Sequence, residues 1–135
     1  MLEKLSKHAD FRGGGGDAMS DVAVAQQLMH EAFADAGLSV KARLRKAAVV
    51  LRLPHRRVRA IWYGEARRID AHEMEAIRNA QAKAVAARLS RMRAALARID
   101  PEFFEPDILA LERIERQARR FVQAAGAAEG EEELT

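Results

Sequence analysis

The segment "RLPHRRVRAIWYGEARR", residues 52–68, places six arginines around the only Trp and the only Tyr of the chain. A guanidinium group can donate two parallel hydrogen bonds to a phosphate, or to O6 and N7 of guanine. Several such groups on one side of a short helix would form a surface for a nucleic acid. The spacing of the residues indicates which side chains face outward.

Helical spacing divides this segment into two faces. Val58, Ile61 and Trp62 share one face by i, i+3, i+4 spacing, which predicts that they anchor the helix on a core. The opposite face carries Arg56, Arg59 and Tyr63. We therefore expect Trp62 to be a buried core residue rather than a platform for a nucleobase.

The middle of the chain is strongly basic. Residues 41–98 contain 16 Lys or Arg and four Asp or Glu, a net charge of +12, whereas the rest of the chain has seven basic and 16 acidic residues, a net charge of −9. The overall charge of +3 hides this asymmetry. A basic middle between acidic ends favours a polyanionic partner.

No other group of residues predicts catalysis or metal binding. The chain has no Cys, which excludes disulfides, thiolate metal sites and cysteine nucleophiles. The histidines (His8, His30, His55 and His72) lack ligand spacing, and "HEME" at 72–75 lacks the second histidine of the HExxH zinc motif. The "GGGG" at 13–16 precedes no lysine, unlike a P-loop. We therefore expect a protein that is not an enzyme, with no catalytic residue, metal or cofactor.

The sequence also indicates where the chain resides. It contains no apolar run of about 20 residues, the length that a membrane span requires. The first residues, "MLEKLSKHADF", lack the apolar stretch of a signal peptide. A cytoplasmic protein without membrane association is expected. A basic amphipathic helix lying on an anionic membrane is the weaker alternative, since few large apolar residues would face outward.

Capping residues and apolar periodicity predict an all-α fold without strands. Ser20 is placed to cap a first helix that Gly37 stops, and Ser39 is placed to cap a second. Pro54 suits the first position of a short third helix, and Gly64 suits its C-cap. The apolar positions expected to face inward are Ala25, Leu28, Met29, Ala32, Phe33 and Ala36 in the first helix, and Val40, Leu44, Ala47, Ala48 and Leu51 in the second.

A long helix and an antiparallel return helix follow. The "DAHE" of residues 70–73 fits a capping box, from which a helix of roughly 28 residues and about 42 Å can run to Ile99. Two prolines in 100–107 separate it from a last helix that ends near Gly126. The residues expected to face inward on this pair are Ala82, Val85, Leu89, Met92, Leu96 and Ile99, and Ile108, Leu111, Ile114, Ala118, Phe121 and Ala125.

These elements predict four regions. Residues 1–17, which contain four consecutive glycines, are expected to form a flexible arm. Residues 18–80 form a compact helical domain, and residues 81–126 form a helical hairpin. Residues 127–135 are expected to be a disordered acidic tail. The hairpin can be purely internal or can form a dimer interface; we expect packing within the chain that also contributes to oligomerisation.

Residues 47–62, "AAVVLRLPHRRVRAIW", resemble the helix-turn-helix of lambda-repressor-like and small prophage regulators. The small Ala48 would let the second helix cross closely, and Leu51 and Leu53 would pack around the turn. Arg52 stands where this motif usually has glycine, so that its backbone would have to be left-handed at some cost. The resemblance covers the motif in detail and residues 20–80 as a helical domain, which would make residues 18–80 a DNA-binding domain.

The resemblance implies a sequence-specific transcriptional regulator of phage or mobile-element type that inserts residues 54–63 into the major groove of double-stranded DNA. Arg56 and Arg59 would contact base edges, and His55 a base or a phosphate. The contacts to phosphates would come from Tyr63, Arg67 and Arg68, with Arg52 and Arg57 as further candidates. A palindromic site would require a homodimer, and RNA polymerase is one protein partner that such a regulator could contact.

Two other classes of protein fit the same pattern. Small terminase subunits also join a helix-turn-helix to long oligomerising helices, and a protein of this class should form a ring of many copies. A protein-interaction module such as an antiactivator would use its arginines on an acidic partner, and should not bind duplex DNA at physiological salt. The number of copies in solution and the affinity for DNA distinguish the three classes.

Overall fold

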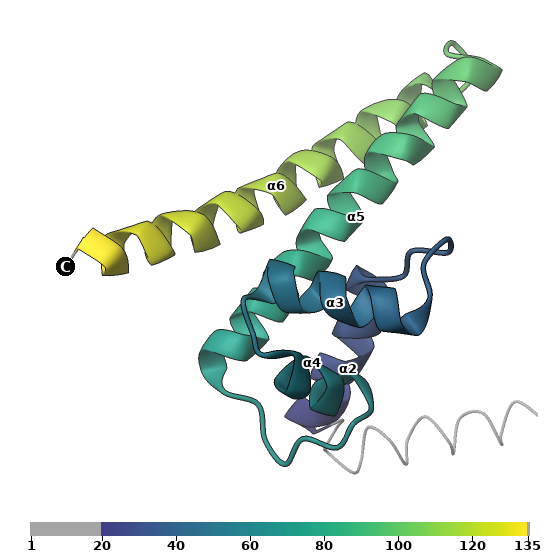
Figure 1. The fold of residues 1–135 in the computed structure, drawn as a ribbon. Coiled ribbons are helices and arrows are strands. Elements are labelled where there is room, and N and C mark those ends of the chain that lie inside the picture. The colour runs from purple at the N-terminus through teal and green to yellow at the C-terminus, as the bar shows by residue number, and fades with distance from the viewer. Residues whose placement is uncertain (1–19, 135) are drawn as a thin grey trace, which may run out of the picture.

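The computed structural model describes the backbone of residues 20–134 and the side chains of residues 20–125, and this part of the chain is all-α, as predicted. Its helices are α2 (Asp21–Ala32), α3 (Val40–Leu51), α4 (His55–Trp62), α5 (Ala71–Ile99) and α6 (Glu105–Leu134). Helices α2, α3 and α4 cluster on the first half of α5, and the rest of α5 projects away with α6 as a hairpin (Figure 1). The expected arm, residues 1–17, lies outside the described residues.

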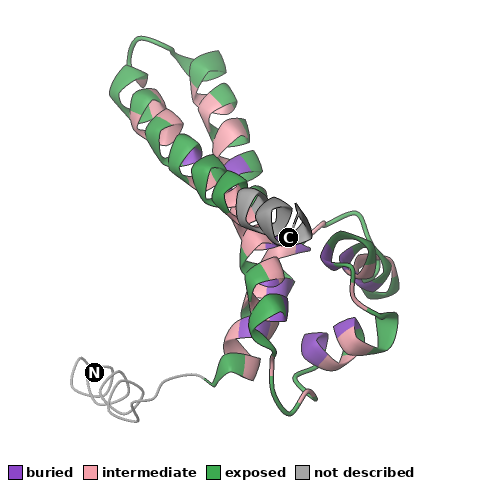
Figure 2. Cartoon of the chain, turned by 90° about the vertical axis from the view of Figure 1, so that its left-hand side faces the viewer, coloured by how far each residue is buried: buried purple, intermediate pink, exposed green. Residues whose placement is uncertain are grey.

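A small apolar core joins α2, α3, α4 and the first half of α5 (Figure 2). Its largest fully buried side chains are Met29, Val58, Ile61 and Ile77. Most positions predicted to face inward on α2 and α3 are buried or half-buried. Ala36 and Val40 are exposed, contrary to the prediction, because one lies in the loop after α2 and the other at the first residue of α3.

The helix starts agree with the predictions to within one residue. Ser20 and Ser39 are N-caps, and each accepts a hydrogen bond of 3.2 Å from the backbone N–H three residues later. Pro54 takes the N-cap position of α4 instead of the first helical position, so that α4 begins at His55. Helix α5 runs from Ala71 to Ile99, as predicted.

Helix α2 ends at Ala32, earlier than the predicted stop at Gly37. The backbone carbonyl of Asp35 accepts hydrogen bonds from Nε and Nη2 of Arg43, at 3.1 and 2.8 Å. The carboxylate of Asp35 also pairs with Nζ of Lys46 at 2.6 Å, which lowers the pKa of that carboxyl group. These contacts with α3 hold Asp35 outside the helix.

The hairpin of α5 and α6 buries much less apolar surface than the core. Between residues 82 and 125 the buried side chains are Ala86 and Glu115. The prediction that Met92, Ile99, Ile114 and Phe121 face inward is wrong, since all four are exposed. Two packed helices cover only a narrow strip of each other, so residues at the edge of the apolar seam stay in solvent.

Helix α6 continues to Leu134, so the predicted end near Gly126 is wrong. The expected tail, residues 127–135, therefore lies largely within this helix. Alanine and glutamate, which dominate this stretch, are strong helix formers, whereas Gly126 and Gly130 each cost only about 1 kcal/mol inside a helix.

The turn between α3 and α4 contains a left-handed residue, as predicted. Arg52 has φ 56° and ψ 43°, and it is the C-cap of α3. The N–H of Leu53 then bonds to the carbonyl of Ala48 at 3.2 Å. A residue with a Cβ pays about 1–2 kcal/mol for this conformation.

Replacement of Arg52 by glycine should therefore stabilise the fold. The relief of backbone strain exceeds the extra chain entropy that glycine loses on folding, and the expected net gain is about 0.5–1 kcal/mol in the free energy of unfolding. Urea denaturation followed by circular dichroism measures this change. The matched control is Arg56→Gly in the first turn of α4, which should destabilise by about 1 kcal/mol. Destabilisation by both variants would contradict the strain argument.

Candidate nucleic-acid interface

Helix α4 presents one apolar and one basic face, as its spacing predicts. Val58 and Ile61 are fully buried, and Trp62 is 5% exposed. On the other side, the side chains predicted to bind DNA are exposed: His55, Arg56, Arg59 and Tyr63. The guanidinium of Arg59 lies 6.0 Å from the centre of the Tyr63 ring, so these two side chains occupy neighbouring positions on the exposed face.

Trp62 attaches the end of α4 to α2. Its indole stacks on the ring of His30, with ring centres 3.9 Å apart and planes at 19°. Its backbone carbonyl lies 2.9 Å from Nε2 of His30 and accepts a hydrogen bond of 3.0 Å from Nε2 of Gln26. The carbonyl is an acceptor only, so the short contact requires a hydrogen on Nε2 of His30. The prediction that Trp62 is a core residue is confirmed.

Gly64 lets the chain leave α4 close to α2. Its N–H bonds to the carbonyl of Ile61 at 3.1 Å, and the N–H of Glu65 bonds to the carbonyl of Ala60 at 2.8 Å, which is a Schellman motif. Gly64 has φ +70°, and a Cβ there would lie 2.8 Å from Oε1 of Gln26. The left-handed backbone favours glycine, and a Cβ there would also displace the end of the Gln26 side chain, which bonds to the carbonyl of Trp62.

Arg57, one of the predicted DNA contacts, forms an ion pair with another described residue of the protein, unlike Arg56 and Arg59. Its Nε and Nη2 each donate a hydrogen bond of 2.7 Å to Glu73, and Nη2 also donates to the carbonyl of Arg68 at 2.6 Å. The Glu73 side chain is 5% exposed. Arg57 lowers the pKa of the Glu73 carboxyl, although burial acts in the opposite direction. The pKa of Arg57 is raised in turn.

Glu73 also completes the start of α5. Its Oε1 accepts a hydrogen bond of 2.9 Å from the backbone N–H of Asp70, as the predicted capping box requires. The buried carboxylate therefore joins the first turn of α5 to the first turn of α4, and Arg57, which it holds, also bonds to the loop at Arg68. The sequence predicts the capping box but not that Arg57 binds the same carboxylate.

The remaining predicted residues surround the exposed face of α4. Arg52 lies in the turn before the helix, and Arg67 and Arg68 lie in the loop after it; all three are exposed. Arg68 has 88% of its side chain in solvent and lies 4.0 Å from Asp70. Within the described part of the chain, Arg56 and Arg59 form no ion pair, so their guanidinium groups are available to an anion.

Two basic residues of α3 extend this surface and were not among the predicted contacts. Lys41 and Arg45 are exposed and share one stripe of α3 with Ala48, the half-buried residue that packs next to the turn. Arg52, which is also exposed, ends the same helix, although its left-handed backbone takes its side chain out of the helical pattern. The i, i+4 spacing of Lys41 and Arg45 is visible in the sequence and could have identified them.

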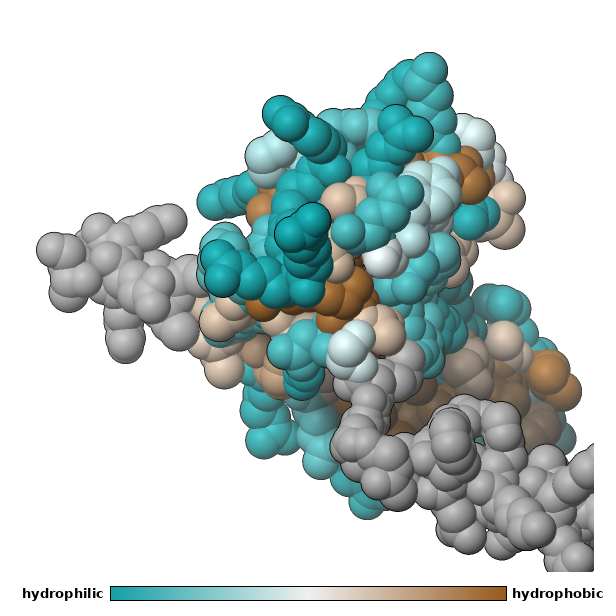
Figure 3. Space-filling model, turned by 90° about the horizontal axis from the view of Figure 1, so that it is seen from below, coloured by the Kyte–Doolittle hydropathy of each residue, from teal (hydrophilic) through white to brown (hydrophobic). Residues whose placement is uncertain are grey.

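Hydrophilic side chains dominate the face formed around α4. Figure 3 views the molecule from this end and shows strongly hydrophilic side chains projecting from it, with apolar surface between them. A hollow of about 370 Å³ beside the start of α4 is lined by Pro54, Arg56, Arg57 and Ala60.

The described part of the chain holds no group of three or more His, Asp or Glu side chains arranged to bind a metal ion. None of the described helices is both long enough and apolar enough to cross a membrane.

No family model matches the sequence, and no match is found among curated proteins or solved structures. The function must therefore be argued from the chemistry of the exposed arginines.

The structural role of Arg57 can be tested against its neighbour. Arg57→Gln removes the partner of a buried carboxylate and should lower the free energy of unfolding by about 1–3 kcal/mol. Arg56→Gln changes an exposed side chain and should alter it by less than about 0.5 kcal/mol. Chemical denaturation of both variants at neutral pH makes the comparison. Equal stability of the two variants would show that the Arg57–Glu73 pair contributes nothing.

Proposed function

We propose that the protein is a sequence-specific regulator that binds double-stranded DNA, with α3, the turn at Arg52 and α4 acting as a helix-turn-helix. The observation that carries this proposal is the division of α4 into a buried apolar face and an exposed face with Arg56 and Arg59. Among the described residues no carboxylate pairs with either arginine. Basic groups that only stabilise a fold usually have acidic partners, as Arg57 does.

The dimensions of α4 and its surroundings fit the major groove. An α-helix with its side chains is about 10–12 Å across, and the major groove is about 12 Å wide. With its apolar face on the core, α4 can enter the groove with Arg56 and Arg59 directed to base edges. Arginine can bind O6 and N7 of one guanine with two hydrogen bonds, which supplies sequence specificity.

The cations around α4 are placed for the DNA backbone. Arg52, Lys41 and Arg45 precede the helix on one side, and Arg67 and Arg68 follow it on the other. Contacts with phosphates fix the register of a protein on DNA and carry no sequence information themselves. With Arg57 assigned to Glu73, the proposed base contacts are Arg56, Arg59 and His55, and the proposed phosphate contacts are Tyr63, Arg67, Arg68, Arg52, Lys41 and Arg45.

Affinity for duplex DNA should fall steeply with salt, because each neutralised phosphate releases counterions. Each contact contributes a slope of about −0.9 to a plot of log affinity against log salt, so four contacts predict roughly a 100-fold loss between about 50 and 200 mM salt. Fluorescence anisotropy with a labelled duplex measures this slope. An affinity that does not change with salt, or an absence of binding at low salt, would contradict DNA binding and favour an interaction with an acidic protein.

Specific recognition can be separated from general attraction with two arginines. Arg59→Ala should cost about 1–3 kcal/mol on a sequence selected from random DNA, and much less on an arbitrary duplex. Arg68→Ala should weaken binding to both duplexes alike and reduce the salt slope by about 1. Affinities of both variants for both duplexes, measured at one salt concentration, give the result. If Arg59→Ala weakens both duplexes equally, α4 lies on the backbone and the assignment of base contacts is wrong.

A further inference from the structure

Four of the large apolar side chains that the hairpin exposes lie in two stripes, one on each helix. Met92 and Ile99 of α5 are 48% and 71% exposed, and Ile114 and Phe121 of α6 are 45% and 50% exposed. Each pair is separated by seven residues, two turns of a helix, so each forms a stripe along its own helix. We call these four residues the lateral face.

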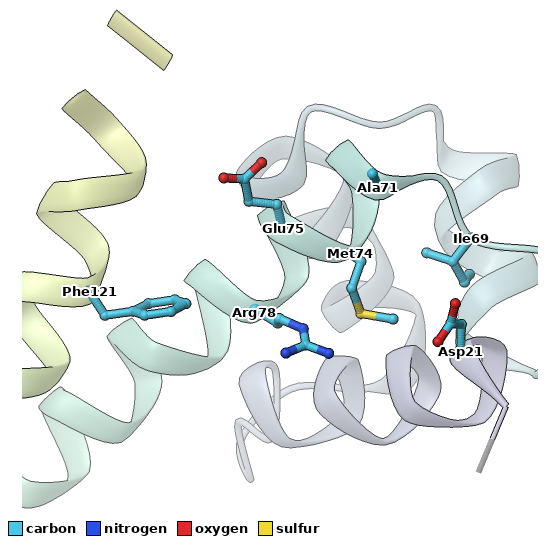
Figure 4. A pocket seen from close by; sticks show the side chains of 7 residues that line it. All are labelled: Asp21, Ile69, Ala71, Met74, Glu75, Arg78 and Phe121. Carbon is cyan, nitrogen blue, oxygen red and sulfur yellow. The ribbon is translucent and has the colours of Figure 1, made fainter. Parts of the chain in front are cut away.

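The two stripes lie on the same side of the hairpin. Met74 precedes Met92 by 18 residues, five full turns at about 3.6 residues per turn, so Met74 lies on the α5 stripe. Met74 and Phe121 line one hollow of about 520 Å³, together with Arg78 and Ile69. Figure 4 shows Phe121 directed from α6 towards Arg78 at the edge of this hollow. The α6 stripe, which includes Phe121, therefore faces the same way as the α5 stripe.

The lateral face differs in charge from the neighbouring side of α6. The positions at 114, 118, 121 and 125 are Ile, Ala, Phe and Ala, with no charge. Leu109, which is 55% exposed, shares its own stripe with three cations: Arg113, Arg116 and Arg120. A surface of like charges repels a copy of itself, whereas an uncharged apolar surface can face a copy of itself.

We propose that the lateral face binds the lateral face of a second copy of this chain, so that two hairpins form a four-helix dimer. In a two-fold interface the same patch of both subunits meets, so a patch must be compatible with itself. The lateral face is mainly apolar; its stripes also carry one cation and one anion, Arg88 one turn before Met92 and Asp107 two turns before Ile114, rather than a row of like charges. In such a bundle the partly exposed apolar residues of each hairpin become buried against those of the other hairpin.

The area of the lateral face is sufficient for binding a second copy of the chain. Each of the four side chains has a surface of about 200 Å² and is roughly half exposed. Together they leave on the order of 400 Å² of exposed apolar surface per chain. A standard interface buries about 800 Å² per partner, of which about 60% is apolar. The lateral face therefore supplies most of the apolar part of one standard interface, and charged residues at its edges would form the polar rim.

The role of this dimer in DNA binding rests on the proposed function. Two copies would present two α4 helices related by a two-fold axis, which is the symmetry of a palindromic site. The self-association itself does not depend on DNA, so the two proposals can fail separately.

The test measures the mass of the full chain in solution by sedimentation equilibrium or light scattering over a range of concentrations. The chain has a mass of 15.0 kDa, and twice this mass is expected for the wild type. Ile114→Glu should raise the dissociation constant of the dimer by at least about 100-fold, since it buries a charge at each copy of the interface. The matched control is Leu109→Glu on the basic stripe of the same helix, which should remain a dimer.

Circular dichroism verifies that each variant is folded. If Ile114→Glu unfolds, Ile99→Glu replaces it, because Ile99 lies at the end of α5 and is the most exposed of the four residues. The proposal is overturned by a wild type that is a monomer or a ring of many copies, by lateral-face variants that remain dimers, or by equal disruption from Leu109→Glu. A monomer with salt-dependent affinity for duplex DNA would overturn the dimer alone, whereas a dimer without such affinity would overturn the proposed function alone.

Discussion

The position of α4 depends on the contact of Trp62 with α2. The last carbonyls of a helix have no partner within the helix, and the carbonyl of Trp62 obtains two from outside, Gln26 and His30. The same His30 stacks on the indole ring. Because Gln26 and His30 are four residues apart on α2, they hold both the ring and the backbone of one residue. This contact leaves the opposite side of α4 exposed to solvent.

The start of α4 is held by a different kind of interaction. Arg57 reaches Glu73 at the first turn of α5, so that α4 is fixed at both ends by separate helices. Desolvation makes an isolated buried carboxylate expensive, and this cost is offset only while Arg57 remains in place. Neighbouring arginines of one short segment therefore have different roles. Charge alone does not distinguish them, whereas the direction of each side chain around the helix does.

Local features of the sequence predicted most of the helix boundaries and buried residues in the region that carries the candidate site. The serine caps depend on residues three positions apart, and the burial of Trp62 depends on its spacing from Val58. The left-handed Arg52 followed from its place in the turn. The missing predictions involve partners that are distant in the sequence: Glu73 for Arg57, and His30 for Trp62. Periodicity identified the apolar stripe of the hairpin, but it does not show how much of that stripe a second helix covers.

Glu115 shows how the hairpin is specified despite its small apolar core. This buried carboxylate on α6 lies 3.2 Å from Nε of Arg93 on α5, and 2.6 Å from Nη2 of Arg119 on its own helix. A buried ion pair gains little net stability, since desolvation offsets much of the attraction. It does penalise a shifted register, because a shift would separate the buried carboxylate from Arg93 and leave Arg119, on its own helix, as its partner. The pair thus fixes α6 on α5. Helix α5, which carries Glu73 at its other end, then sets the position of the hairpin relative to α4.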